Sequence, residues 1–342
     1  MQPPAIMEMV GGVPLLATPV LVTGGCGFLG ARLCARLVAE GCEVIALDDL
    51  SLGNPANLPG AIRDRVRLET IDIRDTVVLR RCLEMYRPRT VFHLAAIHFI
   101  PTCNADPRHA IDVNVIGTQA LLDACAAVGT ADAIVLASSA AVYAPSDAPL
   151  HEERALGPVD IYGLTKLWVE QLAALFHQRT NMPVGIARLF NLFGPGETNP
   201  HLIPDIVAQC QASDTLRLGN LESRRDYVAI DDVVAGLLLL ADACRAHGSL
   251  TCNFGSERSI NGWELVRLIE QLHGRRLIVT QDPARLRPSD NPVILSDCTR
   301  AHDLLGWRAK TTLEDGLVNV LHQPRAAGLA ALPPLPVLPR TP

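Results

Sequence analysis

The stretch Thr23-Gly24-Gly25-Cys26-Gly27-Phe28-Leu29-Gly30 decides the fold, because it joins a short apolar run to a helical pattern that continues from Ala31. Three of its glycines are spaced by three residues, which permits a tight turn and a close approach of the backbone to a pyrophosphate. The N-terminus of the following helix offers unpaired N–H groups to the same anion. A plain glycine turn is the alternative, but a glycine loop between a strand and a helix favours dinucleotide binding. The contacts expected here are Gly24, Gly27, Phe28, Leu29 and Gly30.

Short apolar runs alternate with helical spacings through roughly the first half of the chain. The runs are continuously apolar, which indicates strands that are buried on both faces of a parallel sheet. This order predicts an α/β fold with a doubly wound parallel sheet of the Rossmann type. The strands are expected at Val20–Thr23, Glu43–Leu47, Val66–Ile71, Thr90–Leu94, Ala133–Ala137 and Val184–Leu189.

The pattern becomes irregular after about residue 190, where prolines and glycines interrupt it. We therefore expect a smaller, mixed α/β C-terminal domain that binds the substrate. Asp231–Ala243 and Thr251–Phe254 are expected to return to the main sheet. The expected division is a tail at 1–18, a dinucleotide-binding domain at 19–187 with 229–255, a substrate-binding domain at 188–228 and 256–324, and a Pro-rich tail at 325–342.

Composition narrows the class of protein. The 342 residues are 49% hydrophobic and 19% charged, with a net charge of −6, so nucleic acid is not an expected partner. No stretch of about 18 apolar residues lacks a charge or a proline, so no membrane span is expected. The ten cysteines form no CxxC pair and the ten histidines no HxxxH pair, which favours a cytoplasmic protein with reduced cysteines and no metal.

An acidic pair, Asp48-Asp49, ends the second expected strand. A carboxylate at this place accepts hydrogen bonds from the adenosine ribose and repels a 2′-phosphate. Asp48 therefore favours NAD over NADP as the cofactor. A solvated strand end, or a helix cap from Asp49, is the alternative interpretation.

A second group of residues combines Ser139, just after an expected strand, with Tyr162 and Lys166. Tyr162 and Lys166 are one helical turn apart and share a face. A buried ammonium, together with NAD⁺, lowers the pKa of a neighbouring phenol, which then accepts a proton from a substrate hydroxyl near neutral pH. Only two lysines stand among 30 basic residues, which suggests that Lys166 is needed as an amine. A surface Tyr–Lys pair is the alternative.

The ordered motifs resemble those of the extended short-chain dehydrogenases/reductases, in the nucleotide-sugar epimerase/dehydratase family, over about residues 19–320. The glycine loop resembles TGGxGFxG, the segment 162–166 resembles YxxxK, and the segment 188–195 resembles RxFNxxGP. The resemblance implies NAD as the cofactor. The further cofactor contacts that it implies are Asp72, Ile73, Leu94, Ala95, Ala96, Asn114, Tyr162 and Lys166.

On the substrate side, the resemblance implies that an asparagine and two arginines hold the diphosphate of a nucleotide sugar, with a UDP-sugar favoured. The matching residues are Asn191, Arg225 and Arg287, with Arg224 as an alternative to Arg225. Ser139 and Tyr162 are expected to contact the sugar. The other implied substrate contacts are His201, Leu216, Asp290 and Ile294.

The implied reaction begins with oxidation at C4 of the sugar, as Tyr162 removes the hydroxyl proton and hydride passes to the nicotinamide. Family members that dehydrate or decarboxylate have an acidic residue where this chain has Ala140-Ala141. A methyl group cannot transfer a proton, so 4-epimerisation is favoured, in which the keto sugar rotates and takes the hydride back on its other face. A dehydratase with a nonstandard proton donor, such as His98 or Cys103, is one alternative, and a protein that kept NAD but lost turnover is another.

Two further expectations follow from the resemblance. Ile294 stands where the common 4-epimerases have a tyrosine near the C2 substituent, so a 2-acetamido sugar is admissible. Two long helices, expected at about Ala105–Ala127 and Asp160–Thr180, correspond to the family's dimer bundle and predict a homodimer. The apolar residues expected at this interface are Leu121, Leu122, Val169 and Leu172.

Overall fold

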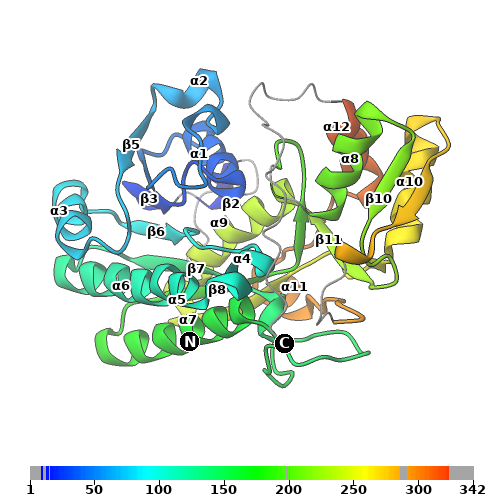
Figure 1. The fold of residues 1–342 in the computed structure, drawn as a ribbon. Coiled ribbons are helices and arrows are strands. Elements are labelled where there is room, and N and C mark those ends of the chain that lie inside the picture. The colour runs from blue at the N-terminus through cyan, green and yellow to red at the C-terminus, as the bar shows by residue number, and fades with distance from the viewer. Residues whose placement is uncertain are drawn as a thin grey trace.

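The computed structural model describes residues 9–10, 13–14, 16–197, 199, 201–285 and 291–322. A seven-stranded parallel sheet forms its centre, with the order β12-β8-β7-β6-β3-β4-β5 (Figure 1). Every residue of β3, β4 and β6 is buried, as expected when helices cover both faces. The doubly wound α/β prediction is confirmed. The strands are β3 (Val20–Thr23), β4 (Val44–Asp48), β5 (Val66–Thr70), β6 (Thr90–His93), β7 (Ala133–Ser139), β8 (Val184–Leu189) and β12 (Ser249–Phe254).

Helices on the two faces of the sheet enclose separate hydrophobic cores. Leu37 of α1 and Leu237 of α9 contribute to one core. Leu79 of α3 and Phe176 of α7 contribute to the other, together with apolar residues of α6. These helices and the neighbouring α11 are α1 (Phe28–Ala39), α3 (Thr76–Tyr86), α6 (Gly117–Val128), α7 (Ile161–Thr180), α9 (Ile230–His247) and α11 (Thr299–Leu305).

A smaller lobe lies beside the carboxyl ends of the strands (Figure 1). It contains a three-stranded sheet of order β13-β11-β9 and a parallel pair, β10 and β14. Its own core includes Phe193, Leu218 and Leu265. The elements are β9 (Asn191–Phe193), α8 (Leu202–Ala212), β10 (Thr215–Leu218), β11 (Arg225–Ala229), β13 (Ser259–Ile260), α10 (Gly262–His273), β14 (Ile278–Gln281) and α12 (Leu313–His322).

The chain returns to the main sheet after β11, since α9 covers the sheet and β12 pairs with β8. α11 also packs here, against α9 and β12, although the sequence placed its segment in the substrate-binding domain. The reason is Trp307, whose ring contacts Phe254 edge-on at 4.9 Å between centroids. Its indole N–H donates to the carbonyl of Asp232 at 2.8 Å, which satisfies the polar group of the buried ring.

Short elements connect these layers. Two of them form a hairpin within the expected N-terminal tail, and Leu16, which follows, is buried in the α1–α9 core. The short elements are β1 (Met9–Val10), β2 (Val13–Pro14), η1 (Pro55–Asn57), α2 (Gly60–Arg63), α4 (Ile100–Ala105), α5 (Pro107–Ile111), the π-helical η2 (Asp112–Ile116), η3 (Ala140–Val142) and η4 (Pro283–Arg285).

One helical run among the described residues, Pro107–Val128, is long and apolar enough to cross a membrane. It joins α5, η2 and α6, and it carries Asp112 and Asp123. Nearly half of its apolar window (44%) is buried within the protein, because α6 packs on α3 and α7. Core helices of soluble proteins meet the same length criterion, so this run is explained as one layer of the fold.

A buried ion pair connects α7 to β8. Two nitrogens of Arg188, Nη2 and Nε, donate to the two carboxylate oxygens of Glu170 at 2.7 and 2.9 Å. The two side chains are only 6% and 8% exposed. The hydroxyl of Ser138 on β7 also donates to Glu170, at 2.5 Å. This network fixes α7 against the carboxyl ends of two neighbouring strands, and no sequence pattern predicted it.

We expect Glu170→Ala to lower the free energy of unfolding by about 3–5 kcal/mol, because it leaves a guanidinium buried without its partner. The matched control is Glu84→Ala, which removes a surface ion pair with Arg80 whose side chains are 50% and 60% exposed. That change should cost less than about 1 kcal/mol. Urea unfolding measures both. Equal effects of the two substitutions would contradict the assignment.

Candidate active site

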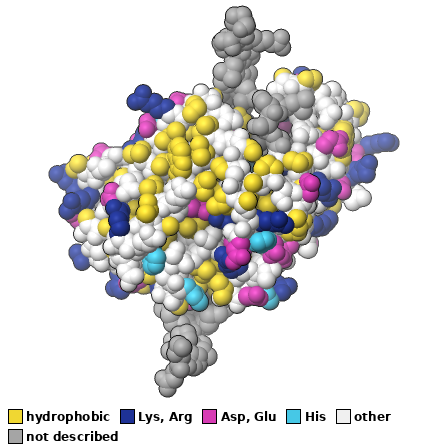
Figure 2. Space-filling view, turned by 90° about the horizontal axis from the view of Figure 1, so that it is seen from below, with side chains coloured by type: hydrophobic (Ala, Val, Ile, Leu, Met, Phe, Trp, Pro, Cys, Tyr) yellow, Lys and Arg dark blue, Asp and Glu magenta, His cyan; other side chains and the backbone are white. Residues whose placement is uncertain are grey.

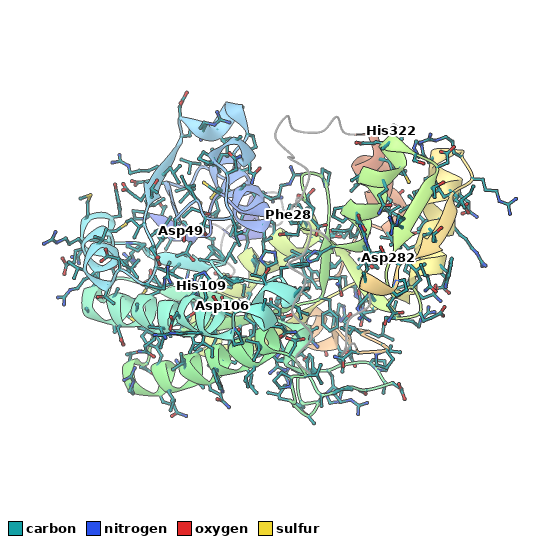
Figure 3. All side chains as sticks on the ribbon, viewed as in Figure 1. Phe28, Asp49, Asp106, His109, Asp282 and His322 are labelled. Carbon is teal, nitrogen blue, oxygen red and sulfur yellow. The ribbon has the colours of Figure 1, made fainter. Side chains whose placement is uncertain are left out.

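A cavity of about 450 Å³ lies along the carboxyl ends of the parallel strands, where ligands bind in open α/β sheets. Its wall includes the glycine loop, Tyr162 on α7 and Arg225 on β11 of the smaller lobe. Figure 3 labels three further wall residues, Phe28, Asp49 and His109, which come from α1, from the segment after β4 and from α5. The cavity therefore extends from the first βα unit to the smaller lobe.

The glycine loop is closed too tightly to admit side chains. A Cβ on Gly30 would overlap the carbonyl oxygen of Gly24, and one on Gly24 would lie 2.8 Å from the amide nitrogen of Ala95. Gly24 has a φ of +68°, which glycine adopts without strain. α1 begins at Phe28 rather than Ala31, so the first helical turn, with its unpaired N–H groups, lies inside the loop. The five predicted loop residues all line the cavity.

The next part of the wall carries two carboxylates. Asp48 is 6% exposed, and its oxygens accept hydrogen bonds from the amides of Cys26 and Leu50, both at 2.9 Å. Burial raises the pKa of Asp48. Asp72 is paired with the guanidinium of Arg74, whose hydrogen bonds lower the pKa of the Asp72 carboxyl. Asp48 thus holds the glycine loop as well as facing the cavity.

The remaining predicted cofactor contacts lie near the middle of the cavity, with one exception. Ile73 and the segment Leu94-Ala95-Ala96 line it. Asn114 lies behind the wall: its side chain accepts from the amide of Ile97 at 2.8 Å and donates to the carbonyl of Ile97 at 2.9 Å. It also donates to Thr165 at 3.0 Å. Asn114 therefore braces the loop after β6 against α7.

Ser139, Tyr162 and Lys166 meet in the cavity wall. The hydroxyl of Ser139 hydrogen-bonds that of Tyr162. The Lys166 ammonium lies 5.8 Å from the centroid of the Tyr162 ring and donates to the carbonyl of Ala137 at 2.8 Å. Asp160 caps α7 by accepting from the amide of Gly163 at 2.8 Å. Local capping and the end of β7 therefore bring the three side chains together.

The sequence predicted a lowered pKa for Tyr162 beside Lys166 and NAD⁺, whereas the pKa of Tyr162 is raised in the protein without a cofactor. Burial is the largest influence on the Tyr162 phenol and raises its pKa, while the hydrogen bond with Ser139 acts in the opposite direction. The net change in the pKa of Tyr162 is therefore upward in the protein without a cofactor. Burial also lowers the pKa of Lys166 to about 8, because the same desolvation disfavours its charged form.

The far end of the cavity carries the predicted substrate contacts. Asn191, His201, Arg225 and Ile294 line it. Nη1 of Arg225 donates to the carbonyls of Arg224 and Asn291, both at 2.8 Å.

The choice between Arg224 and Arg225 is settled as predicted, Leu216 differs from its prediction, and two predicted residues are not tested. Arg224 pairs with Glu264 at 3.1 Å and donates to the carbonyl of Ser259, so Arg225, and not Arg224, faces the cavity. Leu216 is fully buried in the core of the smaller lobe, because β10 points it inward. Arg287 and Asp290 lie outside the described residues.

Several wall residues were not predicted as site residues. Glu197 and Asn199 had no recognisable pattern, since they belong to neither a helix nor a strand. His98, considered only as an alternative proton donor, also lines the cavity. Burial lowers its pKa to about 4. Cys103 is fully buried and donates to the carbonyl of Ile97, so it is packed behind the loop.

Known proteins resemble this chain along nearly its whole length. The family model described as GDP-mannose 4,6 dehydratase matches residues 21–320. The UDP-glucose 4-epimerase of Azospirillum brasilense is 31% identical over 319 residues, which cover 88% of this chain and 90% of that protein.

Two solved structures share the fold. The UDP-glucose 4-epimerase of Thermotoga maritima, crystallised with UDP-glucose, superposes with a TM-score of 0.81 at 27% identity and covers 88% of this chain and 97% of its own. The UDP-glucose 4-epimerase of Thermus thermophilus, in complex with NAD, gives a TM-score of 0.79 at 27% identity, with coverage of 88% and 97%.

The lowered pKa of Lys166 predicts how stability depends on pH. Between about pH 8 and the ordinary value of 10.5, the unfolded lysine still binds a proton that the folded one has released. The free energy of unfolding contributed by this group therefore rises with pH across that window, and below pH 8 the full cost of the buried charge is present. Lys166→Met should remove this dependence.

Urea unfolding at pH 7.5 and pH 9.5 measures the effect in protein free of cofactor. The stability of the wild type relative to Lys166→Met should be higher at the upper pH. Lys310→Met is the control, because Lys310, the other lysine, is exposed; its difference from the wild type should not change with pH. A pH-independent difference for Lys166→Met would be incompatible with a desolvated amine.

Proposed function

We propose, from the premise that this chain belongs to the GDP-mannose 4,6-dehydratase family of nucleotide-sugar-modifying enzymes, that it is an NAD-dependent 4-epimerase of a UDP-sugar. The observation that carries the choice of reaction is the wall beside Ser139, where Ala140 and Ala141 face the cavity. Methyl groups cannot give or take a proton, so the Tyr162–Lys166 pair has no acid beside it at the end of β7. Epimerisation at C4 requires none.

The cavity fits NAD. The glycines of the loop carry no side chains, which leaves the first-turn N–H groups of α1 accessible to the pyrophosphate. Asp48, Asp72 and Ile73 line the cavity; Asp48 would accept hydrogen bonds from the ribose hydroxyls, and Asp72 and Ile73 would contact the adenine. NAD⁺, when bound, takes a hydride from the sugar C4 and gives it back.

The protein's own groups handle the proton and the position of the sugar. Tyr162 removes the C4 hydroxyl proton, and Ser139 shares the hydrogen bond. The positive charge of Lys166 favours the phenolate form of Tyr162 over the phenol. Arg225 and Asn191 hold the diphosphate, as guanidinium groups bind phosphate oxygens in pairs. The sugar turns within the cavity before the hydride returns to its other face.

The proposal predicts interconversion at C4 when the protein is incubated with NAD and UDP-sugars and the products are analysed by NMR. Tyr162→Phe should lose at least about 100-fold in turnover, the usual scale for a general base, and should retain NAD binding. The control is Tyr86→Phe, which removes a phenol that donates to Glu69 away from the cavity and should keep full turnover.

Three other results have distinct meanings. Net loss of water would identify a dehydratase. Failure to convert any UDP-sugar while NAD still binds would indicate a binding protein without turnover. Normal turnover by Tyr162→Phe would overturn the assignment of the base.

Two broader features belong to the same proposal. All ten cysteines are buried free thiols, which fits a reducing cytoplasm. Figure 2, which views the side where α6 and α7 lie in Figure 1, shows apolar side chains gathered across that face. Ile116 and Leu175 are the large exposed ones from these helical layers, at 54% and 55%. This surface suits a homodimer interface.

The interface residues differ from those named from the sequence. Leu121, Leu122 and Val169 are buried in the α3–α6–α7 core, and Leu172 packs against it. Their apolar character is explained by the core, because the helical stripe that they form turns toward the sheet.

Sedimentation equilibrium at micromolar concentration should give a dimer. Leu175→Glu should raise the dissociation constant by at least about 10-fold, because it places a charge in an apolar contact. Met85→Glu, on exposed α3 and 71% accessible, is the control and should leave the dimer intact. A monomeric wild type would refute the homodimer.

A further inference from the structure

A carboxylate–imidazole pair lies in the cavity wall apart from Ser139, Tyr162 and Lys166. Nδ1 of His201 donates a hydrogen bond to Glu197 at 2.6 Å. The Glu197 side chain is 4% exposed and that of His201 is 36% exposed, and both residues line the cavity. The carboxylate accepts only, so it fixes the proton of the neutral ring on Nδ1 and leaves Nε2 as the basic nitrogen.

His98 places this pair close to the catalytic residues. Its ring centroid lies 6.2 Å from that of His201, with the planes at 70°. The charge of Lys166 also contributes to lowering the pKa of His98. Hydrogen bonds to the backbone of Ala96 and the side chain of Asn199 hold it in place. His98 and His201 therefore lie side by side in the wall of the cavity that Lys166 also lines.

Epimerisation at C4 does not require the Glu197–His201 pair. The hydroxyl proton goes to Tyr162 and the hydride returns to the carbon that it left. Burying a carboxylate is costly even when it is paired, and packing alone would not require its imidazole partner to face the cavity. A 4-keto sugar does provide a role for an acid–base pair, because the C–H bonds next to its carbonyl, at C3 and C5, are acidic.

We propose that His201, oriented by Glu197, is a second acid–base group that exchanges a proton with a carbon next to the carbonyl of a bound 4-keto nucleotide sugar. The inference rests on the proposed function, since oxidation at C4 creates that ketone. It extends the substrate class to nucleotide sugars that undergo proton exchange at C3 or C5.

The step is balanced without any further reactant. Nε2 of His201 takes the proton from C3 or C5, and the electrons of that C–H bond move into the carbonyl to give an enolate. The hydroxyls of Ser139 and Tyr162 hydrogen-bond the enolate oxygen, where the charge develops. The imidazolium returns a proton, after exchange with solvent, to the same carbon, and the ketone is restored. Glu197 balances the positive charge that His201 carries in between.

The test supplies the ketone directly. The protein with NAD is incubated in D₂O with a UDP-linked 4-keto-6-deoxyhexose at saturating concentration, and NMR follows deuterium at C3 and C5. The wild type should incorporate deuterium faster than the protein-free solution does. His201→Gln should slow the enzymatic exchange by about 100-fold, the scale for loss of an acid–base group. Because the ketone is saturating, weaker binding does not account for such a loss.

The control is His302→Gln. His302 also hydrogen-bonds a carboxylate, that of Asp303 at 3.0 Å, but on the surface of α11 with 44% and 62% exposure. This variant should exchange at the wild-type rate. Equal rates for the wild type and His201→Gln, or no exchange above the protein-free rate, would overturn the inference.

Glu197 is a positioning residue, and its test separates charge from packing. Glu197→Gln still accepts a hydrogen bond from Nδ1 but no longer balances the imidazolium. Charge-assisted hydrogen bonds are about twice as strong as neutral ones, so exchange at saturation should fall about 10-fold with KM unchanged. Glu197→Asp should restore part of the rate. An unchanged rate in Glu197→Gln would contradict this role.

The C4 assay and the exchange assay fail independently. Interconversion at C4 without deuterium exchange would support the proposed function and contradict this inference. Exchange of the supplied ketone without interconversion at C4 would support the inference and refute the epimerase.

Discussion

The amine of Lys166 is held by the backbone carbonyl of Ala137, and the geometry of the site depends on this hydrogen bond. A neutral acceptor fixes the ammonium at the end of β7 without cancelling its charge. The only carboxylate one turn further along α7, Glu170, has both oxygens engaged by Arg188 and also accepts from Ser138. Glu170 is therefore held by Arg188 and Ser138, and it acts on Lys166 through its charge, which acts to raise the pKa of the amine against the larger effect of burial. The positive charge of Lys166 remains available to the phenol.

A second set of buried polar contacts connects α7 to the cofactor side of the sheet. Asn114 bonds the backbone of Ile97 and the hydroxyl of Thr165, and Thr165 donates to the carbonyl of Tyr162 at 2.7 Å. His93, on β6, bridges Thr23 and Thr118 at 2.7 and 2.8 Å. Each side chain of this set has a partner, which is the condition under which such networks make a structure rigid. The loop that borders the cavity and the helix that carries the base are therefore positioned by the same residues.

The sequence predicted those parts of the site whose residues lie close together in the chain. The glycine loop and the Tyr162–Lys166 turn are local motifs, so their side chains must meet once the strand and helix form. Asn114 and Leu216 show the limit of this reasoning, because matching a motif gives a position in the chain but not the direction of the side chain. Arg224 and Arg225 show it again: neighbours on a strand face opposite ways, and only the pairing of β11 decides which one faces the cavity. Glu170–Arg188 and Glu197–His201 depend on contacts between separate elements or on an irregular segment, where periodicity carries no information.

The contrast between Arg224 and Arg225 also bears on how an acidic protein would bind the diphosphate of the proposed substrate. Arg224 forms an ion pair with Glu264, so its charge is balanced within the smaller lobe. Arg225 donates to two backbone carbonyls, and these contacts orient the guanidinium at the cavity wall. At the opposite end of the cavity Arg74 is paired with Asp72, which suits a neutral adenine ring. Because charge in a cavity acts over a few ångströms more strongly than net charge at a distance, Arg225 at one end and the Arg74–Asp72 pair at the other matter more to a ligand than the net charge of the protein.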